Sequence, residues 1–220
     1  GMKILYHIIN KQPWALCERV CMPWVDMAGL LRETNLPLFS LESRTPLCDF
    51  DVVGFTLQYE LSFTGVLNML DLAGLPVKAA DRHDLSPIVI GGGPCACNPE
   101  PLVDFFDIFI LGEGEEVNLE LIDLYKEAKK QGLSKEEFLI KASHIQGVYV
   151  PSLYDVQYKE DGTIREVTPL KGAPAVVEKR IIKDLDKVFY PESFVVPYTD
   201  IVHDRAVIEV LRGCIRGCRF

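Results

Sequence analysis

The sequence has 220 residues, enough for one large domain or two small ones. Hydrophobic residues make up 48% and charged residues 25%, as expected for a globular protein with a substantial core. Acidic residues outnumber Lys and Arg by 32 to 23, giving a net charge of −9. This balance argues against a broad electrostatic surface for DNA or RNA, although not against a local basic site.

The same sequence features argue against a membrane-spanning or secreted protein. No apolar run approaches 18 residues, so no membrane span is predicted. The apolar stretch at residues 4–9 is too short for a signal peptide, and Gly1 ahead of Met2 is interpreted as a residue left by cloning. Seven cysteines without an export signal predict reduced thiols or metal ligands in a cytoplasmic protein, not a disulfide framework.

Strands and helices are predicted to alternate through the first two thirds of the chain. Apolar runs predict strands over residues 3–9, 36–41, 51–57, 87–90 and 108–111. Helices are predicted over 13–32 (kinked or broken at Pro23), 61–73, about 117–128 and 135–142. This alternation predicts an α/β fold with a parallel sheet and helices on both faces.

The pattern changes after about residue 147. Residues 154–159 and 163–168 flank Asp161-Gly162 and predict a β-hairpin. A proline-punctuated stretch follows, and residues 206–211 predict one more strand. The predicted organisation is therefore an α/β domain over 1–150, a connector with the hairpin over 151–200, and the start of a further domain over 201–220.

Two glycine stretches follow predicted strands. Gly91-Gly92-Gly93 and Gly112-Glu113-Gly114 lie where an open α/β sheet places its ligand crevice. Neither stretch matches G-x-G-x-x-G or a P-loop, and Glu113, Glu115 and Glu116 make the second one unsuited to phosphate. Two interpretations stay open: a ligand crevice, or tight strand-to-helix turns.

The order of the motifs is more specific than any one of them. Gln58-Tyr59-Glu60, Gly91-Gly92-Gly93-Pro94, Asn98-Pro99-Glu100-Pro101 and Gly112-Glu113-Gly114-Glu115 precede Cys214-x3-Cys218. This series resembles the N-terminal region of radical SAM proteins whose first domain is similar to cobalamin-binding domains. The resemblance runs over nearly the whole chain. It implies a flavodoxin-like first domain and then a partial (β/α) barrel, with residues 201–220 as its start.

The resemblance also implies cofactors. Cys214 and Cys218, with a third cysteine after Phe220, would hold a four-iron four-sulfur cluster that binds S-adenosylmethionine. We expect the chain to stop one residue short of that set and to be inactive by itself. Cobalamin is a further candidate, and the resemblance places it among Gln58, Tyr59, Gly91, Gly92, Gly93, Pro94, Gly112, Glu113, Gly114 and Glu115.

Other features favour structural roles. The segment 81–86 lacks the glycine of the cobalt-ligating D-x-H-x-x-G motif, so His83 is interpreted as a surface residue, and cobalamin would bind without it or be absent. Cys17 and Cys21 are predicted to share a helical face in the core. Cys95 and Cys97 supply two ligands where zinc needs four, and are expected to line the crevice or pack beneath it.

Three functions are carried forward. The first is the N-terminal part of a radical SAM enzyme acting on an unknown substrate. RNA and protein are the candidate substrates. The second is a module that binds cobalamin or another small-molecule cofactor. The third is a docking domain that has lost its cofactor. DNA and membranes are not expected partners.

Overall fold

The computed structural model describes residues 1–193, 195–202, 205 and 207–219. The helices are α1 (Met2–Asn10), α2 (Val25–Thr34), α3 (Phe63–Leu72), α4 (Gly114–Gln131) and α5 (Lys135–Ala142). The strands are β1 (Val52–Thr56), β2 (Ile88–Gly92), β3 (Ile108–Ile110), β4 (Val148–Tyr149), β5 (Tyr154–Tyr158) and β6 (Ile164–Pro169). None of the helices within these residues is long and apolar enough to cross a bilayer.

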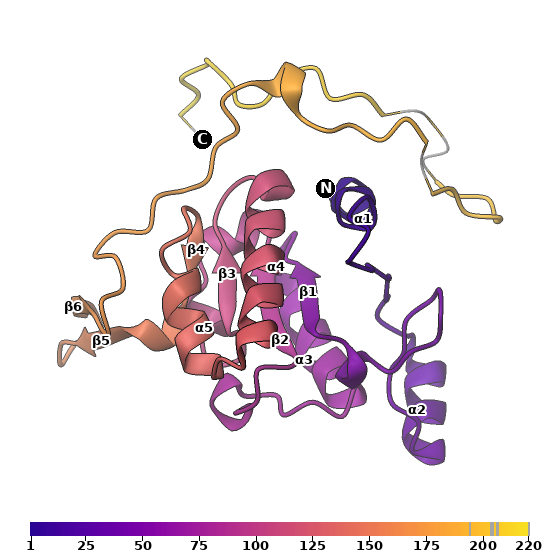
Figure 1. Ribbon diagram of the computed structural model, residues 1–220, viewed down its shortest axis with the longest axis horizontal. Helices are drawn as coiled ribbons and strands as arrows, with labels where there is room; N and C mark the ends of the chain where they lie inside the picture. Colours follow the sequence, from indigo (N-terminus) through magenta and orange to yellow (C-terminus); the bar gives the residue numbers. More distant parts are fainter. Residues whose placement is uncertain (194, 203–204, 206, 220) are drawn as a thin grey trace.

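The central feature is a four-stranded sheet with the order β1-β2-β3-β4 (Figure 1). β1, β2 and β3 are parallel, with Val53 opposite Val89 and Ile90 opposite Ile108, and β4 runs antiparallel to β3. The α/β class and the parallel sheet predicted from the apolar runs are confirmed. The short β4 was not predicted, because two residues carry no periodic signal.

Alternate residues of each strand enter two separate cores. Val53, Val89 and Phe109 pack on one face against α2 and α3. Ile88, Ile90 and Ile108 pack on the other face against α4 and α5. Because β2 and β3 are buried on both faces, they are apolar, which is the signature that identified them in the sequence. β1 is buried on one face, with Gly54 and Thr56 exposed on the other.

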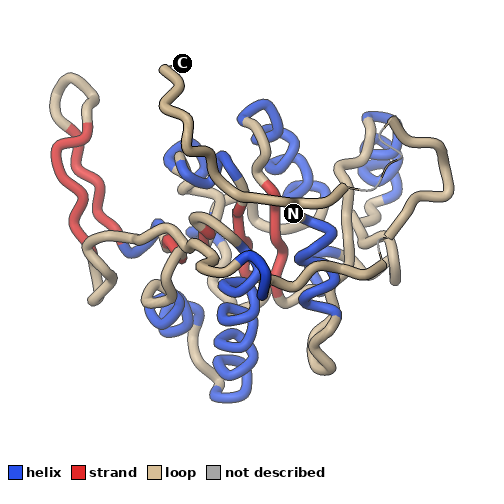
Figure 2. The backbone as a smooth tube through the Cα atoms, turned by 90° about the horizontal axis from the view of Figure 1, so that it is seen from above, coloured by secondary structure: helices blue, strands red, loops and turns tan. Residues whose placement is uncertain are grey.

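The predicted hairpin also forms. β5 and β6 pair antiparallel, with Val156 opposite Val167, and the Gly162 φ of 80° suits the turn. Both views show the hairpin projecting away from the central sheet (Figures 1 and 2). The helix prediction over 135–142 is confirmed as well, and its start is fixed by a capping box between Ser134 and Glu137.

The strand predicted over residues 3–9 is wrong, because this segment is helix α1. Ile8 is buried, and Leu5 lies against the start of α4, with its Cδ2 3.4 Å from where a Cβ at Gly114 would be. Lys3, His7 and Asn10 are spaced by four and three residues, which gives the segment a polar helical face. A short apolar run does not distinguish helix from strand, and this polar spacing was the signal to use.

Because residues 3–9 form helix α1, the sheet lacks the first strand that the sequence predicted. In a doubly wound sheet the ligand crevice lies where the strand order reverses. The described sheet runs β1-β2-β3 in sequence order, so it has no reversal among its parallel strands. The described residues therefore contain no switch point of the kind that the expected flavodoxin-like topology would have.

The helix predicted over 13–32 is wrong in its first half. α2 begins at Val25, and residues 15–24 are neither helix nor strand. Pro13 and Pro23 remove two backbone donors, and the Asn10 side chain instead exchanges two hydrogen bonds with the backbone of Cys17, both 2.9 Å. Cys17 and Cys21 consequently share no helical face.

The strand predicted over 36–41 is also wrong. Its described pairing is a single bridge between Phe39 and Pro46. Leu38 is nonetheless buried in the core that contains α2 and α3, and its amide donates to the Leu72 carbonyl at the end of α3. Pro37 interrupts the donors that a ladder would need, which favours this irregular conformation.

No strand is found over residues 207–211, and no barrel is formed by the residues that the structure describes. Ala206, the first residue of that predicted strand, lies outside the described residues, as does Phe220. Val207, Ile208, Val210 and Leu211 are each more than 60% exposed, so nothing within the described residues covers them as a strand would require.

A buried charge cluster stabilises the amino-terminal end of the sheet. Asp107, just before β3, accepts hydrogen bonds from the Val89 amide (2.8 Å) and the Arg82 guanidinium (3.2 Å). Its second oxygen lies 2.7 Å from Lys135 Nζ at the start of α5. Asp107 thus joins β2, β3, α5 and the loop before β2 through a carboxylate that is 2% exposed.

We predict that Asp107→Ala lowers the free energy of unfolding by about 3 kcal/mol, because two buried cations lose their carboxylate partner. Urea unfolding followed by circular dichroism measures the change. Asp123→Ala, at an exposed position on α4, is the matched control. A loss no larger than that of the control would contradict the structural role given to Asp107.

We predict that Cys17 is an unreactive thiol. Burial raises its pKa to about 11, and the Glu42 and Glu18 carboxylates add to the effect because they oppose a second negative charge. Iodoacetamide at pH 8 should alkylate it at least tenfold more slowly than the exposed Cys21, since the thiolate is the nucleophile. Peptide mass spectrometry measures both rates, and Glu42→Gln should speed the reaction at Cys17. Equal rates at the two thiols would refute the prediction.

Candidate functional site

The residues predicted to form a crevice follow β1, β2 and β3 at the carboxyl edge of the sheet. Gln58 and Tyr59 follow β1 and are exposed. Gly91 and Gly92 belong to β2 itself, and Gly93 and Pro94 follow it. Gly112 and Glu113 follow β3, and Gly114 and Glu115 begin α4. The topology therefore places all ten at one edge, as the alternation of strands and helices predicts.

Two backbone hydrogen bonds join Leu57, after β1, to the end of β2 and the turn that follows it. The Leu57 amide donates to the Gly92 carbonyl (2.6 Å), and the Cys95 amide donates to the Leu57 carbonyl (3.1 Å). Gly93 has a φ of +104°, and a Cβ there would lie 2.8 Å from the Leu57 oxygen. Gly93 therefore accommodates a close approach of the chain's own backbone.

Gly91 has a different local role. It is buried, and a Cβ there would lie 3.0 Å from the rings of both Phe106 and Phe109. These rings belong to the core on the α2 and α3 face of the sheet. The missing side chain thus makes room for aromatic packing.

Cys95 lies in a short 3-10 turn with Cys97, beside the loop after β1. Desolvation raises the pKa of the Cys95 thiol, and the Glu60 carboxylate and Cys97 raise it further. Such surroundings disfavour the thiolate that metal binding or redox chemistry uses. No group of three or more His, Cys, Asp or Glu side chains able to hold a metal ion occurs among the described residues.

The loop after β3 is covered by a distant segment of the chain. The Arg180 amide donates to the Leu111 carbonyl (2.9 Å), and the Glu113 amide donates to the Arg180 carbonyl (3.0 Å). Gly112 has a φ of +108°, and a Cβ there would lie 2.1 Å from the Arg180 oxygen. In Figure 1 this connector, coloured orange to yellow, runs across the top of the view above α1 and the sheet.

The side chain of Arg180 adds electrostatic contacts to this backbone pairing. Its guanidinium lies 2.6 Å from both Glu116 and Glu120 on α4. These hydrogen bonds raise the pKa of Arg180 above its ordinary value. Sequence reasoning missed Arg180, because its partners Glu116 and Glu120 are 64 and 60 residues away.

Arg212 makes a second arginine contact with the same loop. It is ion-paired with Glu115, lies 3.4 Å from Glu113, and is held by Glu209 at 2.8 Å. Glu113 also accepts a hydrogen bond from the Ile182 amide. Two of the acidic partners of Arg212 thus belong to the loop after β3 and the start of α4, and the third, Glu209, belongs to the same C-terminal segment.

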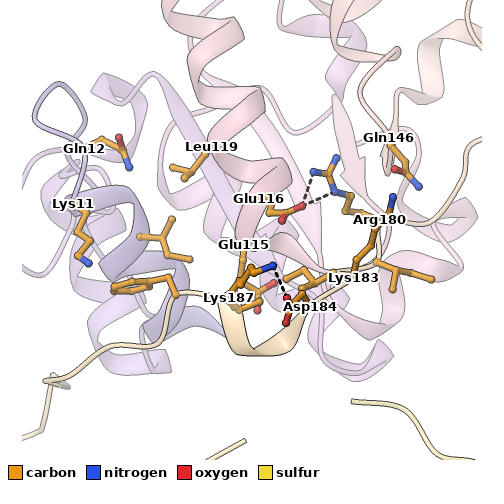
Figure 3. Close-up of a pocket in the computed structure, with 15 residues that line it drawn as sticks. Lys11, Gln12, Glu115, Glu116, Leu119, Gln146, Arg180, Lys183, Asp184 and Lys187 are labelled. Atoms are coloured by element: carbon orange, nitrogen blue, oxygen red, sulfur yellow. Dashed lines mark hydrogen bonds and ion pairs between the residues drawn. The ribbon is translucent and has the colours of Figure 1, made fainter. Parts of the chain in front are cut away.

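A cleft of about 690 Å³ lies beside this network (Figure 3). Its walls come from the end of α1, the first turns of α4 and residues 180–189. Glu115 is the member of the predicted set that lines it, and Lys11, Gln12 and Lys183 contribute polar groups. The Lys11 ammonium lies 4.2 Å from the centre of the Phe189 ring, and both residues line the cleft.

The predicted cluster ligands lie on the exposed tail. Cys214 and Cys218 are both exposed, and the Arg216 amide donates to the Cys214 sulfur (3.4 Å). Two thiolates are one fewer than a cluster with an open iron requires. The described residues therefore do not fit a complete cluster by themselves, and the role of the two cysteines stays a prediction.

Comparison with known proteins supplies the family. The model for radical SAM proteins, N-terminal, matches residues 1–151. The uncharacterized protein MJ0966 of Methanocaldococcus jannaschii is 27% identical over 192 residues, which is 86% of this chain but 34% of that protein. The chain thus spans about a third of the length of this relative. No solved structure matches the chain. With a family match over more than half of its length, the chain belongs to the family of radical SAM proteins and carries their N-terminal domain over residues 1–151.

Proposed function

We propose that this chain is the N-terminal part of a radical SAM enzyme that acts on an unidentified substrate. The observation that carries the proposal is the family match over residues 1–151, followed by Cys214 and Cys218 at the spacing of a cluster loop. An activity of this kind would belong to the longer protein, since the chain spans about a third of its relative.

The chain's own residues would have two tasks in that enzyme. Cys214 and Cys218 would provide two of the thiolates that hold a four-iron four-sulfur cluster. The α/β domain would support the tail that carries them, through Arg212 and its carboxylate partners. The cluster and S-adenosylmethionine, when bound, would supply radical chemistry, which is a property of the cofactors.

We predict that the longer protein takes up iron and sulfide under anaerobic reconstitution. The expected signals are the visible absorbance of a four-iron cluster, a spin resonance signal after reduction, and cleavage of S-adenosylmethionine. Cys214→Ser and Cys218→Ser should each abolish them, because two thiolates do not retain the cluster. Cys97→Ser, at another exposed cysteine, is the matched control.

Cluster formation that survives Cys214→Ser and Cys218→Ser would remove these residues from the proposal. Absence of any cluster in the parent protein, with the fold intact by circular dichroism, would overturn the proposal as a whole.

Cobalamin is left out of this proposal. The edge where it was expected is crossed by the Arg180 segment, and Gly93 and Gly112 both accommodate protein backbone. His83 is exposed in the loop before β2, as the sequence indicated. Cobalamin binding and RNA or protein docking stay predictions from the sequence.

A further inference from the structure

We propose that the acidic loop Gly112–Glu116 is a docking surface for Arg212 of the chain's own C-terminal segment. In this arrangement Glu113 and Glu115 receive Arg212 and thereby position the tail, residues 207–219, on the first domain. The functional purpose of this docking rests on the proposed function, because the tail carries Cys214 and Cys218. The docking itself does not depend on that proposal.

The charge distribution around this loop explains why arginines are received there. Glu113, Glu115, Glu116 and Glu120 bring four carboxylates to one loop and the following helical turns. The positive end of the α4 dipole favours the first three but does not neutralise them. Arg180 lies between Glu116 and Glu120, which leaves Glu113 and Glu115 for a second cation.

Arg212 meets this requirement with its planar fork of donors. Nε and Nη2 bind the two oxygens of Glu209 at 2.8 and 2.9 Å, a bidentate pair that fixes the guanidinium. Its other contacts reach Glu115 and Glu113, whose side chains are 12% and 21% exposed. Partial burial makes these contacts stronger than those of a surface ion pair.

The tail makes a further hydrogen bond beside the dock and borders α1. The Tyr190 hydroxyl donates to the Val207 carbonyl, which joins the tail to the connector. Ile208, Glu209 and Arg212 line a cavity of about 200 Å³ together with Ile4 of α1. Glu113 accepts from the Ile182 amide as well, so one carboxylate contacts both the connector and the tail.

The neighbouring arginines provide a contrast within the same tail. Arg216 and Arg219 are exposed, and within the part of the chain that the structure describes neither forms an ion pair. A general attraction between a basic tail and an acidic domain would engage all three arginines. The observed selectivity for Arg212 indicates a site defined by geometry.

The test measures how often the tail leaves the domain, using the 220-residue chain without iron. Trypsin is applied briefly under native conditions, and cleavage after Arg212, whose side chain is 22% exposed and paired with carboxylates, is compared by mass spectrometry with cleavage after the exposed Arg216. When opening is fast, the cleavage rate follows the population of the open form. Glu115→Gln leaves the tail sequence unchanged, so any change in rate reports docking.

We expect Glu115→Gln to raise the cleavage rate about fivefold, since losing an ion pair of about 1 kcal/mol shifts the open population by that factor. Glu113→Gln should raise it as well, because it removes the other loop carboxylate beside Arg212. Asp123→Asn, at an exposed position on α4, is the matched control and should have no effect. Unfolding midpoints are compared so that loss of the fold is recognised.

Equal cleavage of the parent and Glu115→Gln chains, with both folded, would overturn the dock. So would an equal rise in cleavage with Asp123→Asn, because the effect would then not be specific to the carboxylates that contact Arg212. A dock without a cluster in the longer protein would refute the proposed function alone, and a cluster without a dock would refute this inference alone.

Discussion

The carboxyl edge of the sheet depends on one steric constraint, the absence of a side chain at Gly112. A Cβ at this position would lie 2.1 Å from the Arg180 oxygen, a distance that no backbone adjustment of ordinary size relieves. Only with that space free can the Arg180 amide and carbonyl pair with Leu111 and Glu113. The placement of the Arg180 guanidinium between two carboxylates, and of Ile182 on Glu113, follows from this pairing.

The two edges of the sheet use charge in different ways. At the amino-terminal edge, Asp107 is buried with Arg82 and Lys135, and its partners all belong to the same α/β domain. At the carboxyl edge the carboxylates are partly exposed and their partners come from residues 180 and 212. Buried pairs are costly to break, whereas partly exposed pairs open more readily and respond to salt. The first edge therefore stabilises the domain, and the second joins it to the segment that follows.

Sequence reasoning succeeded where the signal is local. The apolar runs at β1, β2 and β3, the helix over 135–142 and the Asp161-Gly162 turn each depend on residues close together in the sequence, and each formed as predicted. It failed at residues 3–9, where helix and strand patterns coincide and the contact with α4 decides. It also could not place Arg180 against Gly112, because 67 residues separate them and the pairing is made by backbone groups that any sequence carries.

The glycines show that a motif can be located from the sequence although the group that approaches it cannot be identified there. A glycine after a parallel strand indicates that some group approaches the backbone closely, and at Gly93 and Gly112 a group does. Here that group is the backbone of Leu57 or Arg180, from the same chain. A segment held by a few backbone hydrogen bonds and partly exposed ion pairs is less stable than the two cores, so local opening is expected to begin there. Any ligand of this edge would compete with the Arg180 segment, and its affinity would be reduced by the free energy needed to displace that segment.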